Sequence, residues 1–199
     1  MIEESAARRR GGGRPRDEGL RLRVLEIAVD VYAEHGWSGF NFETVSSAAG
    51  AGRPALYRRW ADRSALLTDA ILSTTPEVVD VDLGSLHDEL LRILREYLQV
   101  LGGSRGRAGQ RLYLDRDAIP DIVAAVHERL MGRRFQVVCA AMRRGADRAG
   151  RPAAIPDRLA FAFLLGGALM WGGGDDPRPA ADAEAIVASV VALTGFTEP

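Results

Sequence analysis

The chain has 199 residues, 47% of them hydrophobic, and a formal net charge of −1. This length and apolar content allow a sizeable core in one or two domains and exclude a disordered tail protein. The single cysteine, Cys139, excludes an internal disulfide and a multi-cysteine metal site. All 26 basic residues are arginine, and two segments concentrate them: residues 1–16 hold five against two glutamates, and residues 53–63 hold four against one aspartate.

Residues 1–17 are expected to form a disordered basic arm. The sequence RRRGGGRPR has no apolar period and contains three consecutive glycines, and it is too polar for a signal peptide. Arg14-Pro15-Arg16 resembles short arms that lie in the narrow minor groove of DNA, where negative potential attracts arginine. A tail that only improves solubility is the alternative.

A helix-turn-helix is predicted after this arm. Residues 18–35 follow the 3.6-residue period of an amphipathic helix, which Gly36 ends. A short helix then begins at Asn41, whose side-chain oxygen can accept bonds from the free N–H groups of the first turn. Gly50 ends this helix, because glycine adopts the left-handed backbone of a sharp reversal. A second helix of about two turns starts near Pro54, which a first turn tolerates.

The second helix is predicted to present its polar side to DNA. Leu56 and Trp60 are expected to face inward, which leaves Tyr57, Arg58 and Arg59 facing outward. Such groups add no stability to a globular protein, whereas a recognition helix in a major groove needs them for base edges and phosphates. The alternative is a solvated helix whose basic face has no role in binding. The combination of helix, glycine turn, proline and basic helix favours the helix-turn-helix.

The run G-x-G-R-P-A-L-Y-R-R-W followed by A-D-R-S-A-L-L, at residues 50–67, resembles the DNA-binding signature of TetR-family transcriptional regulators. The resemblance covers about the first 75 residues. It implies that Arg53, Pro54, Ala55 and Tyr57 lie in or at the mouth of the major groove, and that Arg58 and Arg63 contact phosphates. The predicted DNA contacts are therefore Arg53, Pro54, Ala55, Tyr57, Arg58, Arg59 and Arg63, with Arg14 and Arg16 from the arm.

Two positions depart from the family pattern. Ala55 is often threonine in relatives, so a hydroxyl contact is lost and a methyl contact remains. Glu43 stands where relatives often have a basic or small residue that meets phosphate. Because a carboxylate there would repel DNA, Glu43 is expected to interact with the N-terminal dipole of its helix.

Residues 76–199 are expected to form a second helical domain, after a DNA-binding domain at 18–75. Pro76 and an acidic stretch form a linker or turn. The segment 155–171 is apolar on nearly all sides, which indicates a buried helix or a subunit interface rather than a membrane span, for which it is short. The whole chain is predicted to be all-α, with about nine helices. Those of the second domain are expected at 86–101, 110–117, 119–149, 155–171 and 181–193.

The family resemblance implies a dimer and a ligand pocket. In TetR-like proteins the last two helices pair with those of a second subunit, so a homodimer through about 155–173 and 181–193 is expected. A two-fold dimer can also place its recognition helices in successive major grooves, roughly 34 Å apart. The middle helices of such regulators usually enclose a small molecule. The candidate pocket residues, each of which is more often ordinary core, are Tyr97, Tyr113, His127, Phe135, Cys139, Met142 and Trp171.

The sequence therefore predicts a cytoplasmic, sequence-specific regulator, most often a repressor in this family, that a small molecule releases from a palindromic operator. A constitutive repressor without an inducer and a helical adaptor that has lost DNA binding are the alternatives. An enzyme is the rival class, but the three histidines are dispersed and there is no phosphate loop. The carboxylates Asp115, Asp117 and Asp121 match no metal-binding loop. No catalytic residue, cofactor, metal or membrane partner is expected.

Overall fold

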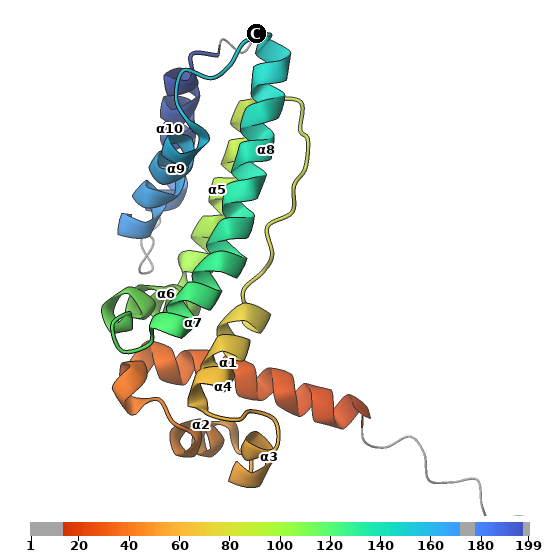
Figure 1. Ribbon diagram of the computed structural model, residues 1–199, viewed down its shortest axis with the longest axis vertical. Helices are drawn as coiled ribbons and strands as arrows, with labels where there is room; N and C mark the ends of the chain where they lie inside the picture. The colour runs from red at the N-terminus through yellow and green to blue at the C-terminus, as the bar shows by residue number, and fades with distance from the viewer. Residues whose placement is uncertain (1–13, 172–177, 197–199) are drawn as a thin grey trace, which may run out of the picture.

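The computed structural model describes residues 14–171 and 178–196, and these residues are all-α (Figure 1). A π-helical turn (His127–Met131) joins two helices into one continuous rod over 120–149. With that rod counted once, the described residues form nine helices, so the predicted fold is confirmed. The helices are α1 (Arg14–Gly39), α2 (Phe42–Ala49), α3 (Arg53–Tyr57), α4 (Arg63–Thr74), α5 (Leu86–Leu101), α6 (Gly103–Asp115), α7 (Pro120–Val126), α8 (Gly132–Ala149), α9 (Asp157–Trp171) and α10 (Arg178–Thr194).

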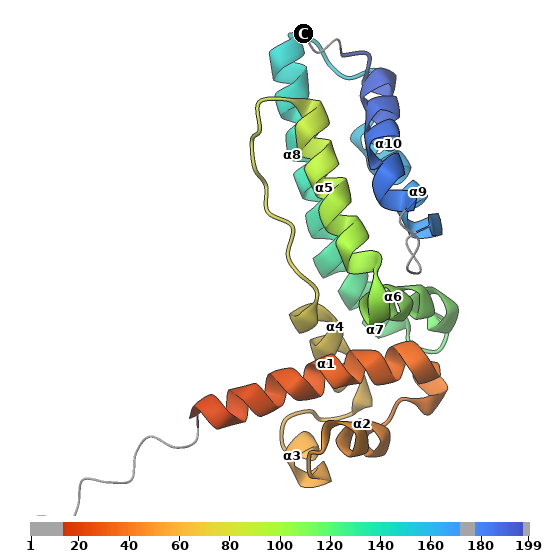
Figure 2. The same ribbon diagram turned by 180° about the vertical axis from the view of Figure 1, so that it is seen from behind.

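The helices gather at two ends of an elongated molecule. Helices α1–α4 lie at one end, and α5, α8, α9 and α10 run side by side at the other, with α6 and α7 between them (Figures 1 and 2). The linker after α4 runs along the bundle to its far end, where α5 begins and returns toward α1. None of the described helices is long and apolar enough to cross a membrane.

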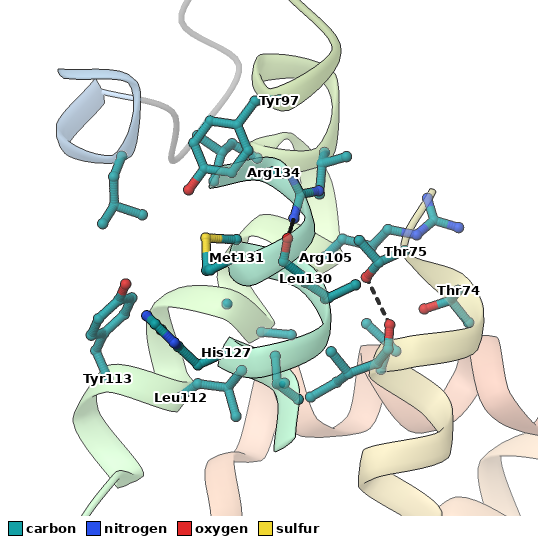
Figure 3. Close-up of a pocket in the computed structure, with 18 of the residues that line it drawn as sticks. Thr74, Thr75, Tyr97, Arg105, Leu112, Tyr113, His127, Leu130, Met131 and Arg134 are labelled. Atoms are coloured by element: carbon teal, nitrogen blue, oxygen red, sulfur yellow. Dashed lines mark hydrogen bonds between the residues drawn. The ribbon is translucent and has the colours of Figure 1, made fainter. Parts of the chain in front are cut away.

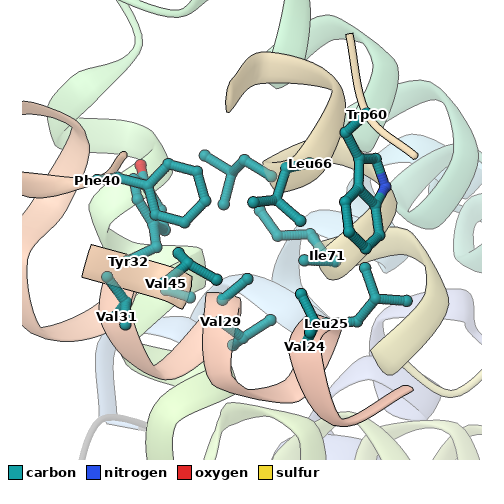
Figure 4. Close-up of a cluster of buried hydrophobic side chains, with 14 of the residues drawn as sticks. Val24, Leu25, Val29, Val31, Tyr32, Phe40, Val45, Trp60, Leu66 and Ile71 are labelled. Atoms are coloured by element: carbon teal, nitrogen blue, oxygen red, sulfur yellow. The ribbon is translucent and has the colours of Figure 1, made fainter. Parts of the chain in front are cut away.

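One buried cluster holds α1 against the helix-turn-helix. The inward face of α1 contributes Leu25, Ala28 and Tyr32, each 0% exposed, and these pack among side chains from α2 and α4 (Figure 4). Phe40 lies edge-on to Tyr32, with ring centroids 6.0 Å apart, in the turn between α1 and α2. Removal of this apolar surface from water stabilises the four helices as one unit. A separate cluster fills the bundle of α5, α8, α9 and α10.

Helix α1 begins at Arg14, earlier than the expected position 18. Residues 14–17 of the predicted arm are therefore helical, while residues 1–13 and the side chains of 14–17 lie outside the described part of the chain. Pro15 is tolerated in the first turn, where its missing N–H had no partner to lose, and Glu18 suits the positive end of the helix dipole. These local preferences outweigh the polarity that suggested disorder.

Helix α6 begins at Gly103 instead of the expected position 110. Two glycines make this start possible. Gly103 has φ +63°, and at Gly106 a Cβ would lie 1.7 Å from the carbonyl oxygen of Leu101. The glycine-rich sequence has low helix propensity, but packing of α6 along α1 and α5 overrides it. Helix α10 also begins earlier than expected, at Arg178 instead of 181.

The linker between α4 and α5 is held against the bundle by a buried carboxylate. Glu89 of α5 is 1% exposed and accepts hydrogen bonds from Arg144 at 2.6 Å and Arg148 at 3.0 Å, both on α8. The same arginines pair with Asp80 and Asp82 of the linker, at 2.8 and 3.3 Å. Because a buried charge is costly unless it is paired, these contacts fix the path of the linker.

At the end of α1, hydrogen bonds to side chains of α6 replace backbone bonds within the helix. Gly36 leaves the helical conformation, with φ 63° and ψ −171°. In a regular helix the Trp37 N–H would bond to the carbonyl of Ala33. Here it donates to Asp115 of α6 at 2.9 Å, and the Ala33 carbonyl accepts instead from Arg111 at 2.8 Å. Side chains of α6 therefore satisfy the backbone groups that the kink leaves without partners in α1.

We expect Asp115→Ala to lower the free energy of unfolding by about 1–3 kcal/mol, because Tyr32 is 0% exposed and its hydroxyl donates to Asp115 at 3.0 Å. The matched control is Asp117→Ala, since the Asp117 side chain is 98% exposed and should change stability little. Urea unfolding followed by circular dichroism measures both. Equal effects of the two substitutions would contradict the assigned role of Asp115.

Candidate nucleic-acid interface

Helix α2 is capped at both ends as its sequence predicted. The Asn41 side-chain oxygen accepts hydrogen bonds from the N–H groups of Glu43 and Thr44, each at 2.9 Å, and the Thr44 hydroxyl accepts from the Asn41 N–H. Gly50 has φ 60° and ψ 31°, the left-handed conformation expected of it. These caps satisfy the free backbone groups of a two-turn helix and set the angle at which the chain leaves it.

Helix α3 is shorter than expected, with five residues from Arg53 to Tyr57. Arg58 and Arg59 follow its end instead of lying within it. The predicted inward side is confirmed: Leu56 is 1% exposed, and Trp60 is 6% exposed. A tight turn after α3 allows Trp60 to reach the core only three residues past the last helical position.

The outer side of α3 gathers exposed side chains of the kinds that read DNA. Tyr57 is 62% exposed, and its ring lies edge-on to Phe42 of α2 at 4.6 Å between centroids. This contact holds the ring beside α2. Pro54 and Arg58 are also exposed, while Ala55 and Arg59 are half-buried.

Arg53 projects from the first turn of α3 and pairs with Glu43 of α2. Both side chains are largely exposed, at 55% and 70%. The expected interaction of Glu43 with the N-terminus of α2 is compatible with its place in the first turn, but its contact with Arg53 was not predicted. The carboxylate of Glu43 offsets the charge of Arg53.

Arg63 has an intramolecular role that the sequence did not reveal. Its guanidinium carbon lies 3.8 Å from the ring centroid of Trp37, a cation–π contact. It also donates hydrogen bonds to the carbonyls of Phe40 at 2.9 Å and Trp37 at 3.2 Å. Arg63 thus connects the start of α4 to the turn after α1 through these contacts. The predicted phosphate contact of Arg63 stays a prediction. The predicted minor-groove contacts of Arg14 and Arg16 also stay predictions, since their side chains lie outside the described part.

Asp69 of α4 holds three segments of this domain together. It accepts hydrogen bonds from Arg21 of α1 at 2.9 Å, from the Trp60 indole at 2.9 Å and from the Ser73 hydroxyl at 2.7 Å. Burial alone would raise the pKa of Asp69, but the bonds from Trp60, Ser73 and Arg21 outweigh burial and hold that pKa below its ordinary value. The carboxylate therefore anchors the segment that follows α3.

Comparison with known proteins identifies this domain. Residues 24–70 match the family model of bacterial regulatory proteins, tetR family. Residues 24–70 therefore form a DNA-binding domain of the TetR type. It is 32% identical over 74 residues to the uncharacterised HTH-type transcriptional regulator YdeS of Bacillus subtilis, and 38% identical over 72 residues to the HTH-type transcriptional regulator AqdR of Rhodococcus erythropolis. These matches cover 37% and 36% of this chain, and 37% and 35% of the lengths of the two relatives.

Solved structures of TetR-family members share the whole fold. A transcription regulator of this family from Marinobacter aquaeolei superposes with a TM-score of 0.61 at 17% identity, over 89% of this chain and 98% of that one. NalD of Pseudomonas aeruginosa, the secondary repressor of the MexAB-OprM multidrug efflux pump, gives 0.60 at 21% identity, over 89% and 97%. The family comprises regulators and not enzymes, in agreement with the expectation from sequence.

A cavity of about 120 Å³ lies where the TetR-type DNA-binding domain meets the rest of the chain (Figure 3). Its wall includes Val29 of α1 and Thr74 of α4, together with side chains from α5 to α9. Three of the predicted pocket residues, Tyr97, Tyr113 and His127, line it. Because α1 and α4 contribute to the wall, a molecule in this cavity would contact both halves of the protein at once.

Phe135, Cys139 and Met142 do not line this cavity. Phe135 packs edge-on against Phe161 of α9 at 5.4 Å between centroids, and Met142 is 2% exposed in the core of the bundle. Cys139 is half-buried; burial and the neighbouring Asp157 raise the pKa of its thiol to about 11, so it stays protonated at neutral pH. A helical apolar stripe does not reveal which turn faces a cavity, and the ligand contacts of these three residues stay predictions. The side chain of Trp171 lies outside the described part.

Sequence reasoning missed most of the cavity wall. Arg134 and Arg105 line it, as do Thr74 and Thr75 at the end of α4. Arg134 could have been found as an arginine at an inward position of the long helix, one turn after Leu130. Among the described residues, no group of three or more histidine, cysteine or acidic side chains is arranged to hold a metal ion.

We expect Asp69→Asn to destabilise the protein by about 1–2 kcal/mol near neutral pH, because the charged bond to Arg21 is lost. A depressed folded-state pKa gives stability that is complete above the unfolded pKa of about 4 and is lost as the pH falls through the folded pKa. The difference between wild type and variant should therefore shrink on acidification. Urea unfolding at a series of pH values measures it, and a constant difference would contradict this role.

Proposed function

We propose that the chain is a cytoplasmic, homodimeric transcriptional regulator that binds a palindromic operator and that a small molecule releases from DNA. The observation that carries the proposal is the α2–α3 segment. The segment lies in the part of the chain that matches the family model, and α2 is capped at both ends. Its inner side is buried, and Arg53, Pro54, Tyr57 and Arg58 are exposed. A rigid base under exposed arginine, aromatic and proline side chains suits insertion of α3 into a major groove.

The roles proposed for the DNA contacts are unequal. Arg53 and Tyr57, on the first and last residues of α3, are the proposed base contacts, since a guanidinium fork matches a guanine edge. Arg58 and Arg59, after α3, are the proposed phosphate contacts together with Arg63. Ala55 offers a methyl group to a thymine. Arg14 and Arg16, at the start of α1, would extend the contact into the minor groove.

The proposed dimer is supported by exposed apolar stripes on the last two helices. On α9, Phe163 is 49% exposed and Leu159 is 38% exposed, although the opposite side of the helix is buried. On α10, Leu193 is 47% exposed. Contiguous exposed apolar surface of this kind marks a protein interface. A two-fold axis would place the stripes of one subunit against the same stripes of a second subunit. The exposed positions are Leu159, Ala162, Phe163 and Gly166 on α9, and Ala185, Ala188, Ala192 and Leu193 on α10.

Ligand control is supported by the position of the cavity. A ligand that fits the cavity better in a second conformation would shift the protein toward that conformation, in proportion to its difference in affinity. Helices α1 and α4 contribute Val29, Ile71 and Thr74 to the wall. A displacement of α4 would move α3 through Asp69 and Trp60. The distance between the two recognition helices of the dimer is the quantity that would change.

We expect Arg53→Ala to weaken binding to the preferred operator by about 1–3 kcal/mol and to reduce the preference for that sequence. Mobility shifts with the promoter DNA beside the protein's own gene, and with scrambled DNA of the same length, measure both effects. Arg143→Ala, an exposed arginine far along α8, is the matched control. An equal loss on every sequence would make Arg53 a phosphate contact. Absence of tight binding by the wild type would favour an adaptor that has lost DNA binding.

We expect Phe163→Arg to convert the protein to a monomer at micromolar concentration and to weaken operator binding, since a single α3 contacts only one half-site. Leu114→Arg is the control, because Leu114 is 81% exposed and belongs to α6, outside the proposed interface of α9 and α10. Light scattering measures the mass, and circular dichroism confirms that both variants are folded. A wild type that is monomeric, or a Phe163→Arg variant that stays dimeric, would contradict the proposed interface.

A further inference from the structure

Arg134 is a buried cation with few partners. It lies on the first turn of α8, and only 4% of its surface is exposed. Its Nη1 donates a hydrogen bond to the Leu130 carbonyl at 3.4 Å, at the long limit for such a bond. Its guanidinium carbon lies 5.2 Å from the ring centroid of Tyr97, on α5. A guanidinium has five N–H donors, so most of them are left for another partner.

No described carboxylate pairs with Arg134. The acidic side chain with the clearest electrostatic influence on it is Glu96 of α5, and that carboxylate is bonded to Arg92 at 2.5 Å. Burial lowers the pKa of Arg134, while Tyr97 and Glu96 act in the opposite direction. Arg134 differs in this from Glu89, the buried carboxylate of the bundle, which has two arginine partners. A buried charge without a counterion is costly, which suggests a partner that arrives from outside.

The cavity beside Arg134 has the character of an anion site with apolar walls. Figure 3 shows Arg134 and Tyr97 at one side of the cavity, with Tyr113 and His127 at another. Arg105 also lines it, and none of the described lining residues is acidic. The remaining wall is mostly aliphatic, with Leu112, Val126, Leu130 and Met131 among its members. A positive group at one side and apolar side chains around it match a molecule with one acidic group and an apolar body.

We propose that the effector is an organic anion, with a carboxylate or similar acidic group bound by Arg134 and an apolar body against the aliphatic wall. This assignment of ligand class rests on the proposed ligand-controlled function. Arginine suits the role because its planar fork can form two parallel charge-assisted hydrogen bonds with such a group. Binding would also supply the counterion that the buried guanidinium lacks.

Two matched fluorescent probes test the proposal. The anionic probe is 1-anilinonaphthalene-8-sulfonate, and the neutral probe is N-phenyl-1-naphthylamine, which has the same rings without the sulfonate. Their affinities are measured by fluorescence titration of the full chain, of Arg134→Met and of the control Arg143→Met, an exposed arginine on the same helix. Methionine keeps an unbranched apolar side chain at position 134. Thermal unfolding of each variant reports whether Arg134 also has a structural role.

We expect the wild type to bind the anionic probe more tightly than the neutral one. Arg134→Met should weaken the anionic probe by about tenfold and leave the neutral probe within about twofold, without a fall in Tm. Arg143→Met should change neither affinity. The proposal is overturned if the wild type shows no preference for the anion, if Arg134→Met weakens both probes equally or neither, or if it lowers Tm and both affinities together.

The probe titrations are independent of the proposed DNA binding. Operator binding by the wild type is measured separately, by mobility shift without probe. A wild type that binds operator DNA but shows no preference for the anionic probe would overturn the ligand assignment alone. Selective anion binding by a wild type that does not bind DNA would overturn the proposed regulator and leave the anion site in place.

Discussion

Helix α1 packs against both halves of the molecule, and the position of the DNA-reading segment depends on it. One face of α1 buries Leu25, Ala28 and Tyr32 against α2 and α4, and its C-terminal end is bonded to Arg111 and Asp115 of α6. The kink at Gly36 makes the bonds to α6 possible, because it frees the Trp37 N–H and the Ala33 carbonyl for side chains of α6. Gly36 has φ +63°, a left-handed backbone conformation that favours glycine at this position.

The candidate ligand cavity lies at the same junction. Its wall takes side chains from α1 and α4 on one side and from α5, α6, α7 and α8 on the other. A molecule that fills it would therefore contact the helices that position α3, without touching DNA. The elements most able to pass on a displacement are α4, through Asp69 and Trp60, and α6, through Asp115. This arrangement gives the proposed coupling a physical route in packed side chains and hydrogen bonds.

Local features were predictable from sequence, and long-range ones were not. The Asn41 cap, the Gly50 turn and the inward positions of Leu56 and Trp60 depend on residues within a few positions of one another. The bond between Tyr32 and Asp115 joins residues 83 positions apart, and no sequence period marks it.

Arginines are the clearest case of this limit. The sequence did not reveal that Arg63 stacks on Trp37 or that Arg134 lies buried beside a cavity. The central claim is that two copies of α3, held by α1 and a dimer of α9 and α10, read DNA together. Selection of bound sequences from random DNA by the purified full chain tests it most directly. The account predicts a palindrome with half-sites separated by about one helical turn or a multiple of it. Enrichment of a single unrepeated half-site, or of no sequence, would contradict it.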